Sequence, residues 1–391
     1  MSHRINPLVG AVAVPPIAEA KAWIAGRTFP ADKPLIDLAQ GEPSYPPPPE
    51  LSDHLAGMLG RPEMARYTAI EGLPTLRAAL ATDMRAVYGG VVAADQLCIT
   101  AGCNQAFCLA LMALARAGDE VIVPAPYYFN HQMWLDMLGL RAVHLPLRAA
   151  EGGVPNVGDA AARITRHTRA IVLVTPNNPT GAVYPPEVID AFFELARQHD
   201  VALVIDETYR DFLAGDAPPH GLFRRADWPG TLVHLYSFSK VYALTGYRVG
   251  AVACGSDLLG EIAKAMDCVA ICAPRIGQEA ALYGLERLGP WRREMRALMR
   301  GRAVALREAF RHNDLAYELV SVGGFFAYLR HPFPGAAGAE VARRLAEEQN
   351  LLCLPGSMFG AGQEPYLRLA FANVDAELMP EIARRLATSQ G

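Results

Sequence analysis

The middle of the chain alternates short, continuously apolar runs with stretches of helical length. The apolar runs are "LCIT" (97–100), "EVIVP" (120–124), "RAVHLPL" (141–147), "RAIVLVTP" (169–176), "VALVIDE" (201–207), "TLVHLYSFS" (231–239) and "VGAVAC" (249–254). Helices are predicted at 105–118, 130–139 and 186–200. Runs without polar alternation are typical of strands that are buried on both faces. The pattern therefore predicts an α/β fold with a mainly parallel sheet between helices.

The pattern changes on either side of this region. Residues 41–50, "GEPSYPPPPE", are stiff and extended because proline fixes the backbone and breaks helices. After about residue 280, an arginine-rich helix at 291–312 precedes short strands such as "GGFFAYL" and "YLRLAFA". We therefore expect a large α/β domain at residues 46–280 and a smaller α+β domain at 281–391, with the N-terminal segment 1–45 packed against the smaller one.

Composition narrows the class of protein. The 391 residues include 40 acidic and 36 basic side chains, which gives a net charge of −4. A nucleic-acid-binding protein usually carries a basic face, so this balance argues against one. The seven cysteines are scattered without a CxxC pair, and no HExxH occurs. We expect no metal site and a reducing, cytoplasmic location.

One run without charges, residues 97–115, is long enough to span a membrane. Thr100, Gly102, Asn104 and Gln105 stand close together near its start. A turn in that place fits a strand and a buried helix better than one spanning helix, so no membrane partner is predicted.

Polar residues follow four of the predicted strands, and open α/β sheets bind ligands beyond the carboxyl ends of their strands. The run 97–100 leads through "AGCNQA" into a helix whose N–H groups and dipole suit a phosphate. "NNPTG" follows 169–176, Asp206 lies at the end of the next run, and Ser237, Ser239 and Lys240 close the one after it. Each feature alone is equally well read as a turn, a helix cap or a loop residue. Neither GxGxxG nor a P-loop occurs, so a dinucleotide or nucleoside triphosphate site is disfavoured.

Lys240 lies between two apolar runs. Burial disfavours the charged form of an amine, and an uncharged lysine is a nucleophile toward carbonyl groups. A carboxylate at the end of an apolar strand, such as Asp206, needs a cationic partner. An amine, a carboxylate, a hydroxyl, an amide and a set of phosphate donors together match one cofactor, pyridoxal 5′-phosphate (PLP).

In their order and spacing, these motifs resemble the class I/II aminotransferases of the aspartate aminotransferase superfamily, which are PLP-dependent proteins of fold type I. The resemblance covers nearly the whole chain and includes "GEP" (41–43), "YTAIEGLPTLRAAL" (67–80), "AGCNQAF" (101–107), "PAPYYFN" (124–130), "NNPTG" (177–181), "DETY" (206–209), "SFSKVYALTGYRVG" (237–250), "LPGSMFG" (354–360) and "YLRLAFA" (366–372). It implies a large domain with a mainly parallel seven-stranded sheet between helices, and a smaller α+β domain.

The resemblance also implies roles for single residues. Lys240 would form the Schiff base with PLP and carry a proton between the substrate Cα and C4′ of the cofactor. Asp206 would pair with the pyridine nitrogen, Tyr209 and Asn178 would bond the phenolate oxygen, and Tyr128 would stack on the ring.

Two binding sets complete these roles. The phosphate would be held by Gly102, Cys103, Asn104, Ser237, Ser239 and Arg248, with Tyr67 reaching in from the other subunit of a homodimer. The substrate α-carboxylate would be bound by Arg368, whose planar guanidinium suits a carboxylate, with Asn178 and the backbone at Gly41 assisting.

Two observations limit the resemblance. His131 stands where the family often has a second aromatic residue, three positions after the stacking ring. The motifs identify no basic residue that would bind the side-chain carboxylate of an acidic substrate. Arg27, Arg61 and Arg66 could still reach the pocket from flexible segments. We therefore expect a neutral amino donor, aromatic or aliphatic.

The resulting hypothesis is a transaminase that passes an amino group from an L-amino acid to a 2-oxo acid by a ping-pong mechanism. The same residues also serve PLP-dependent C–S β-lyases and related fold-type I enzymes. A ligand-sensing module of a DNA-binding regulator is a more remote alternative. It would need a basic helical domain upstream, and only about 45 residues precede the large domain.

Overall fold

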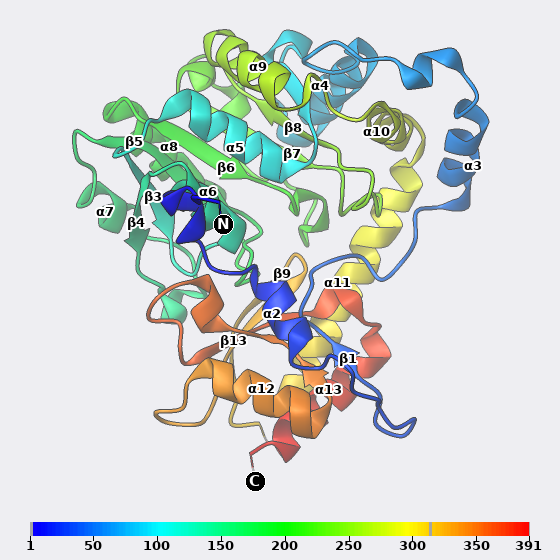
Figure 1. The fold of residues 1–391 in the computed structure, drawn as a ribbon, viewed down its shortest axis with the longest axis vertical. Helices are drawn as coiled ribbons and strands as arrows, with labels where there is room; N and C mark the ends of the chain where they lie inside the picture. Colours follow the sequence, from blue (N-terminus) through cyan, green and yellow to red (C-terminus); the bar gives the residue numbers. More distant parts are fainter. Residues whose placement is uncertain (1–2, 313–314, 391) are drawn as a thin grey trace.

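The computed structural model describes residues 3–312 and 315–390. Its larger body, in the upper half of Figure 1, is built on a seven-stranded sheet with the order β2-β8-β7-β6-β5-β3-β4. The strands are β2 (Leu97–Thr100), β3 (Glu120–Pro124), β4 (Arg141–Leu145), β5 (Thr168–Val174), β6 (Ala202–Asp206), β7 (Leu232–Ser237) and β8 (Gly250–Ala253). All neighbours are parallel except β8, which runs antiparallel to β2 and β7. The prediction of a mainly parallel sheet is confirmed.

Helices cover this sheet. They are α3 (Pro49–Met58), α4 (Pro74–Tyr88), α5 (Cys103–Leu114), α6 (Phe129–Met137), α7 (Val157–Ala161), α8 (Pro186–Gln198), α9 (Ser256–Ala270) and α10 (Arg275–Arg287). The charge-free run 97–115 forms a strand, a turn and a buried helix, as predicted. In the described part of the chain, no helix has the length and apolar character needed to cross a membrane.

The helix α5 ends earlier than the sequence pattern suggested. Ala115 already has an extended backbone, with φ −140° and ψ 153°. The carboxylate of Asp119 accepts a hydrogen bond from the backbone N–H of Arg116, at 3.1 Å. Together with the backbone bond from the N–H of Asp119 to the carbonyl of Arg116, at 3.0 Å, it closes a turn over 116–119. The helix ends at Leu114, so the predicted end at residue 118 was wrong.

The smaller body contains a four-stranded antiparallel sheet with the order β12-β13-β10-β9. Its strands are β9 (Glu318–Gly323), β10 (Phe326–Arg330), β12 (Leu354–Pro355) and β13 (Tyr366–Ala370), with helices α12 (Gly338–Gln349) and α13 (Met379–Thr388) alongside. The N-terminal segment divides between the two bodies. Strand β1 (Ile36–Asp37) pairs with β11 (Leu351–Leu352), and α2 (Pro16–Ala22) packs on β12, whereas α1 (Pro7–Gly10) lies against α6.

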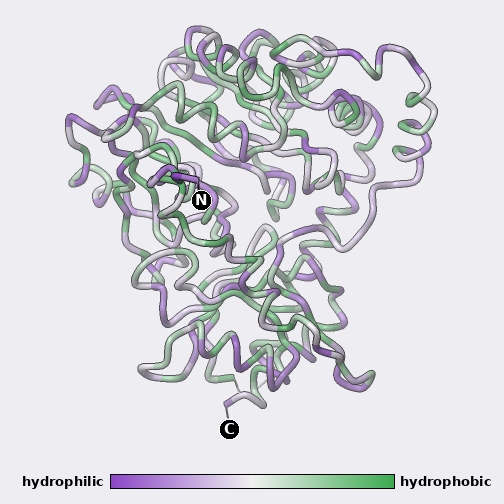
Figure 2. The backbone as a smooth tube through the Cα atoms, viewed as in Figure 1, coloured by the Kyte–Doolittle hydropathy of each residue, from purple (hydrophilic) through white to green (hydrophobic). Residues whose placement is uncertain are grey.

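Two hydrophobic cores correspond to the two bodies, and one helix belongs to both. Met295 and Met299 of α11 (Gly289–His312) are buried in the first core, which includes the seven-stranded sheet. Leu306 of the same helix is buried in the second core. Figure 2 shows the hydrophobic colour along the central strands of the larger sheet and hydrophilic segments mainly on the outer helices and loops. On this basis, we retain the division near residue 280 as a proposal, with α11 as the connecting element.

Candidate active site

A cavity of about 240 Å³ lies at the carboxyl ends of β5, β6 and β7. It brings together most of the residues singled out in the sequence. Those that line it are Cys103, Asn104, Tyr128, Asn178, Asp206, Tyr209, Ser237, Ser239, Lys240 and Arg248. Gln40 and Glu42 from the N-terminal segment, and Val174, Thr208 and Thr245, complete the wall.

Lys240 occupies the turn that follows β7. Its Nζ donates a hydrogen bond to the carbonyl oxygen of Gly41, at 2.8 Å. Burial lowers the pKa of Lys240 to about 8, and the nearby carboxylate of Glu42 opposes this effect. An amine with this pKa is uncharged in roughly a tenth of the molecules at pH 7, far more often than an ordinary lysine, and the uncharged form is the one that attacks a carbonyl.

Asp206 ends β6, and its side chain is buried. Oδ1 accepts hydrogen bonds from the backbone N–H and the hydroxyl of Thr208, at 3.0 and 2.7 Å. Oδ2 lies 3.3 Å from Nε2 of His131. Burial by itself would raise the pKa of Asp206, but His131 and Thr208 outweigh it and hold that pKa below its usual value. The site therefore keeps a buried negative charge.

The role of His131 was missed in the sequence, where it was only a departure from the family pattern. Its ring is buried, stacks on Phe107 with centroids 3.8 Å apart, and lies edge-on to Tyr128 at 5.0 Å. The signal was the spacing, because residues three apart on a helix share a face. Tyr128 precedes α6 and His131 lies in its first turn, so a helix start at this point places both toward the cavity.

Hydrogen-bond donors converge where α5 begins. Gly102 precedes the helix with a φ of +84°, and an added Cβ would lie 2.2 Å from an Nη atom of Arg248. Arg248 is held by the carbonyls of Ala101 and Thr245, at 3.3 and 3.0 Å. The hydroxyl of Ser239 is buried and has no hydrogen-bond partner among the described residues. A helix N-terminus, a guanidinium and an unpartnered hydroxyl together form an anion site.

Two tyrosines and one asparagine stand across the cavity. Burial raises the pKa of Tyr128 to about 12 and that of Tyr209 well above its usual value, so both hydroxyls remain protonated and can donate hydrogen bonds. Tyr209 packs against the rings of Phe325 and Phe326. Oδ1 of Asn178 accepts a hydrogen bond from Nη1 of Arg368, at 3.1 Å.

Arg368 lies behind Asn178 and does not itself line the cavity. It comes from β13 of the smaller body, bonds to the carbonyl of Ala39, and is only 1% exposed. Burial lowers its pKa to about 10, which leaves it charged at neutral pH. Gly41 reaches the site through its carbonyl, and Tyr67 is 74% exposed and outside the cavity.

The three arginines considered for a distal carboxylate lie elsewhere. The guanidinium of Arg27 donates to the carbonyls of Ala346 and Glu347, at 2.7 and 2.9 Å, near the end of α12. Arg61 and Arg66 flank the short helix η1 (Pro62–Ala65), and both are exposed. None of the three lines the cavity.

Comparison with known proteins agrees with this geometry. The family "Aminotransferase class I and II" matches residues 33–386. The arginine–pyruvate transaminase of Pseudomonas aeruginosa is 30% identical, over 90% of this chain and 89% of that protein. An aromatic aminotransferase of Arabidopsis thaliana is 28% identical, over 95% and 93%. The structure of a single mutant of Thermus thermophilus aspartate aminotransferase superposes with a TM-score of 0.89 at 28% identity, covering 99% of this chain and 100% of that one.

PLP is the cofactor of this family, and the cavity fits it. The anion site at α5 suits its phosphate, Asp206 suits its ring nitrogen, and Lys240 presents an amine toward the same cavity. The chain belongs to the class I and II aminotransferases, and it is a PLP-dependent transaminase.

Proposed function

We propose that this transaminase takes its amino group from a neutral L-amino acid, aromatic or aliphatic, and passes it to a 2-oxo acid in a ping-pong reaction through Lys240. The observation that carries the proposal is the position of Lys240 and Asp206 in one cavity, with an anion site at its end. When bound, PLP supplies an electron sink for the negative charge that develops on Cα of the amino acid.

Side chains of the cavity would supply a fixed charge, a proton acceptor and hydrogen-bond donors. Asp206 stays ionised, because His131 and Thr208 hold its pKa low, and its charge keeps a ring nitrogen protonated. Lys240, with a pKa of about 8, can accept a proton at Nζ from Cα and release it again, as general acid–base catalysis requires. Tyr209 and Asn178 would donate hydrogen bonds to the phenolate oxygen.

The substrate's α-carboxylate would bind near Asn178 and Arg368. The bond between these two side chains already aims one Nη atom of Arg368 toward the cavity wall. A bidentate pair between a guanidinium and a carboxylate fixes both position and orientation. Small adjustments of Asn178 would open Arg368 to the substrate.

We also propose a homodimer with shared sites, a cytoplasmic location and a neutral donor. The exposed ring of Tyr67 is free to reach a neighbouring subunit, in keeping with a homodimer whose sites are shared. A cytoplasmic location still rests on the cysteine pattern. The neutral donor is favoured because the cations that line the cavity, Lys240 and Arg248, already have roles, and Arg27 is bound at α12.

The names of relatives do not select the substrate, since aspartate, aromatic and arginine aminotransferases are all similar to this chain. A donor screen decides it. Purified protein with PLP is assayed with each amino acid against pyruvate, 2-oxoglutarate and oxaloacetate. We expect aromatic or aliphatic donors to give the highest kcat/KM. A clear preference for aspartate or glutamate would overturn the proposed substrate class and leave the transaminase assignment intact.

A further inference from the structure

The side-chain amine and the backbone carbonyl of Lys240 both form hydrogen bonds with one short segment, residues 41–45. Its Nζ donates to the carbonyl of Gly41 at 2.8 Å. Its backbone carbonyl accepts from the hydroxyl of Tyr45, 3.5 Å away, which is a long and therefore weak bond. Burial raises the pKa of Tyr45, so this hydroxyl keeps its proton and can donate.

The chain around Lys240 has no regular structure of its own. Residues 238–249, between β7 and β8, contain turns and neither helix nor strand. Carbonyls in such a segment need partners from outside, because an unpaired buried carbonyl is costly. The carbonyl of Val241 finds one in the indole N–H of Trp291, at 3.2 Å. Trp291 also meets the ring of Tyr45 edge-on, with centroids 5.7 Å apart.

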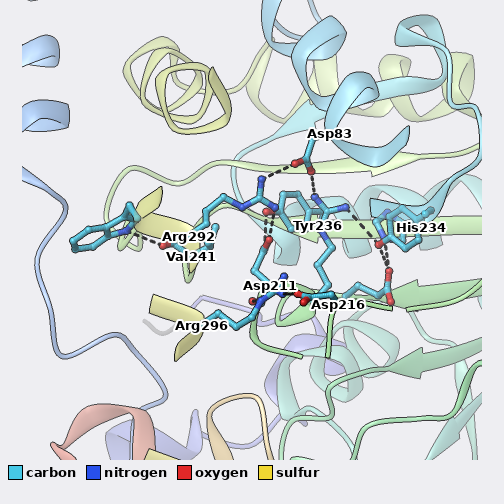
Figure 3. A network of polar contacts seen from close by, with 12 residues as sticks. Asp83, Asp211, Asp216, His234, Tyr236, Val241, Arg292 and Arg296 are labelled. Carbon is cyan, nitrogen blue, oxygen red and sulfur yellow. Dashed lines mark hydrogen bonds and ion pairs between the residues drawn. The ribbon is translucent and has the colours of Figure 1, made fainter. Parts of the chain in front are cut away.

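Trp291 is itself firmly held. It lies in the first turn of α11, next to Arg292, which forms ion pairs of 2.6 Å with both Asp83 and Asp211. One turn further along, Arg296 bonds the backbone carbonyl of Asp211 at 3.1 Å. Figure 3 shows these partners converging from α4, from the turn after β6 and from α11. These ion pairs and the bond from Arg296 tie the start of α11 to α4 and to the turn after β6.

We propose that Trp291 is a positioning residue for Lys240, which it holds through the carbonyl of Val241 and through the ring of Tyr45. The start of α11 holds the indole of Trp291, and the indole holds the turn at Val241. This turn then sets the position of the Lys240 amine. The proposal rests on Lys240 being the reactive amine of the proposed function.

The pKa of the Lys240 amine, and therefore its reactivity at a given pH, depends on the groups around it. The charged and titratable groups around it are Glu42, Tyr45, Cys103, Tyr128, Asp206, Tyr209, Arg248 and Arg368. Burial among them is the largest influence on Lys240, and it disfavours the ammonium form. If the turn is released, water reaches the amine more often and its proton affinity returns toward that of an ordinary lysine.

The test compares Trp291→Phe with two other variants. Trp291→Phe keeps a ring against Tyr45 and removes the N–H donor, and Tyr45→Phe removes only the weaker bond to Lys240. Trp23→Phe is the matched control, because Trp23 is a half-buried indole that packs against the second core and donates no hydrogen bond to a described residue. Its removal loses an indole without touching the turn.

The measurement is the pH dependence of trace acetylation at Lys240 in full-length protein freed of PLP, followed by mass spectrometry of the Lys240 peptide. We expect the midpoint to rise by about one pH unit in Trp291→Phe, by less in Tyr45→Phe, and not at all in Trp23→Phe. Melting curves show which variants are folded. A midpoint equal to the parent's in folded Trp291→Phe would overturn the proposal, and so would an equal shift in the control. If Trp291→Phe does not fold, an unchanged midpoint in Tyr45→Phe decides against it.

The holoenzyme provides a second readout. The loss of positioning predicts a fall in kcat of about tenfold with KM nearly unchanged, because a displaced catalytic group affects the reaction more than binding. Labelling requires no turnover. If the parent and the variants label as expected but the parent does not transaminate, the proposed function is contradicted and the positioning role of Trp291 is not.

Discussion

Nε2 of His131 lies 3.3 Å from Oδ2 of Asp206, and both side chains are almost completely buried. The contact joins the first turn of α6 to the end of β6, two elements that are distant in the sequence. It explains how a carboxylate at the end of an apolar strand remains ionised.

His131→Phe is expected to preserve the stacking on Phe107 and to remove the partner of Asp206. We predict a loss of about 1–3 kcal/mol in the free energy of unfolding near pH 7, since a buried polar partner disappears. The pKa of Asp206 is held low in the folded state, so its contribution is complete above the unfolded value and is lost as pH falls through the folded one. The difference between parent and variant should therefore shrink below about pH 4.

Urea unfolding of both proteins across this pH range checks the prediction. Asp206→Asn is the companion variant, because it removes the charge and keeps the shape. If His131→Phe were equally destabilising with and without the Asp206→Asn substitution, the contact would contribute nothing.

Arg368→Lys is expected to weaken the binding of every α-carboxylate substrate. An ammonium group cannot reproduce the planar fork of the guanidinium, and its bond to Asn178 would be lost as well. KM should rise about tenfold or more for all donors and acceptors, with the visible band of bound PLP retained. Steady-state kinetics with an unchanged KM would place the carboxylate site elsewhere.

Gly301 lies in α11 between the residues buried in the first core and those buried in the second. It is exposed, and a Cβ at this position would have no heavy atom within 4 Å. Gly301→Ala should therefore stabilise the protein by up to about 1 kcal/mol, because glycine is a poor helix former.

Chemical denaturation measures this difference directly. A loss of stability on Gly301→Ala would contradict the prediction. It would mean that the helix needs the backbone freedom of glycine at residue 301, although a Cβ there has room.

The sequence was informative where burial dictates the residue type. Strands such as β5 and β6 are buried on both faces, so they appear as unbroken apolar runs, and the polar residues that end them point to the site. The antiparallel direction of β8 could not be read, because a four-residue strand of small side chains carries no directional signal. The chain after α5 turns through bonds between Arg116 and Asp119 and a bond from Gly118 to Gly139, a contact between separate segments that helix propensity does not reveal.

Contacts between distant segments were the other limit. The bond from Lys240 to Gly41 spans 199 positions, and that from Arg368 to Asn178 spans 190. Family resemblance named three of these residues and assigned Gly41 only a backbone role, without predicting that its carbonyl meets the lysine. Arg27 could be discounted only once its bonds to the end of α12 were seen.

We propose that this enzyme keeps the amino group on the cofactor after the Cα proton has left, as a transaminase must. A single-turnover experiment tests it most directly: a good neutral donor is added to the PLP-loaded protein in the absence of any 2-oxo acid. We expect the visible band of the aldehyde form to be replaced by that of the amine form, and pyruvate or 2-oxoglutarate to restore it. Lys240→Ala, although folded, should do neither at a comparable rate. Steady release of ammonia and pyruvate from a Cβ-substituted amino acid, with no lasting change of the band by any donor, would contradict transamination and identify a β-lyase.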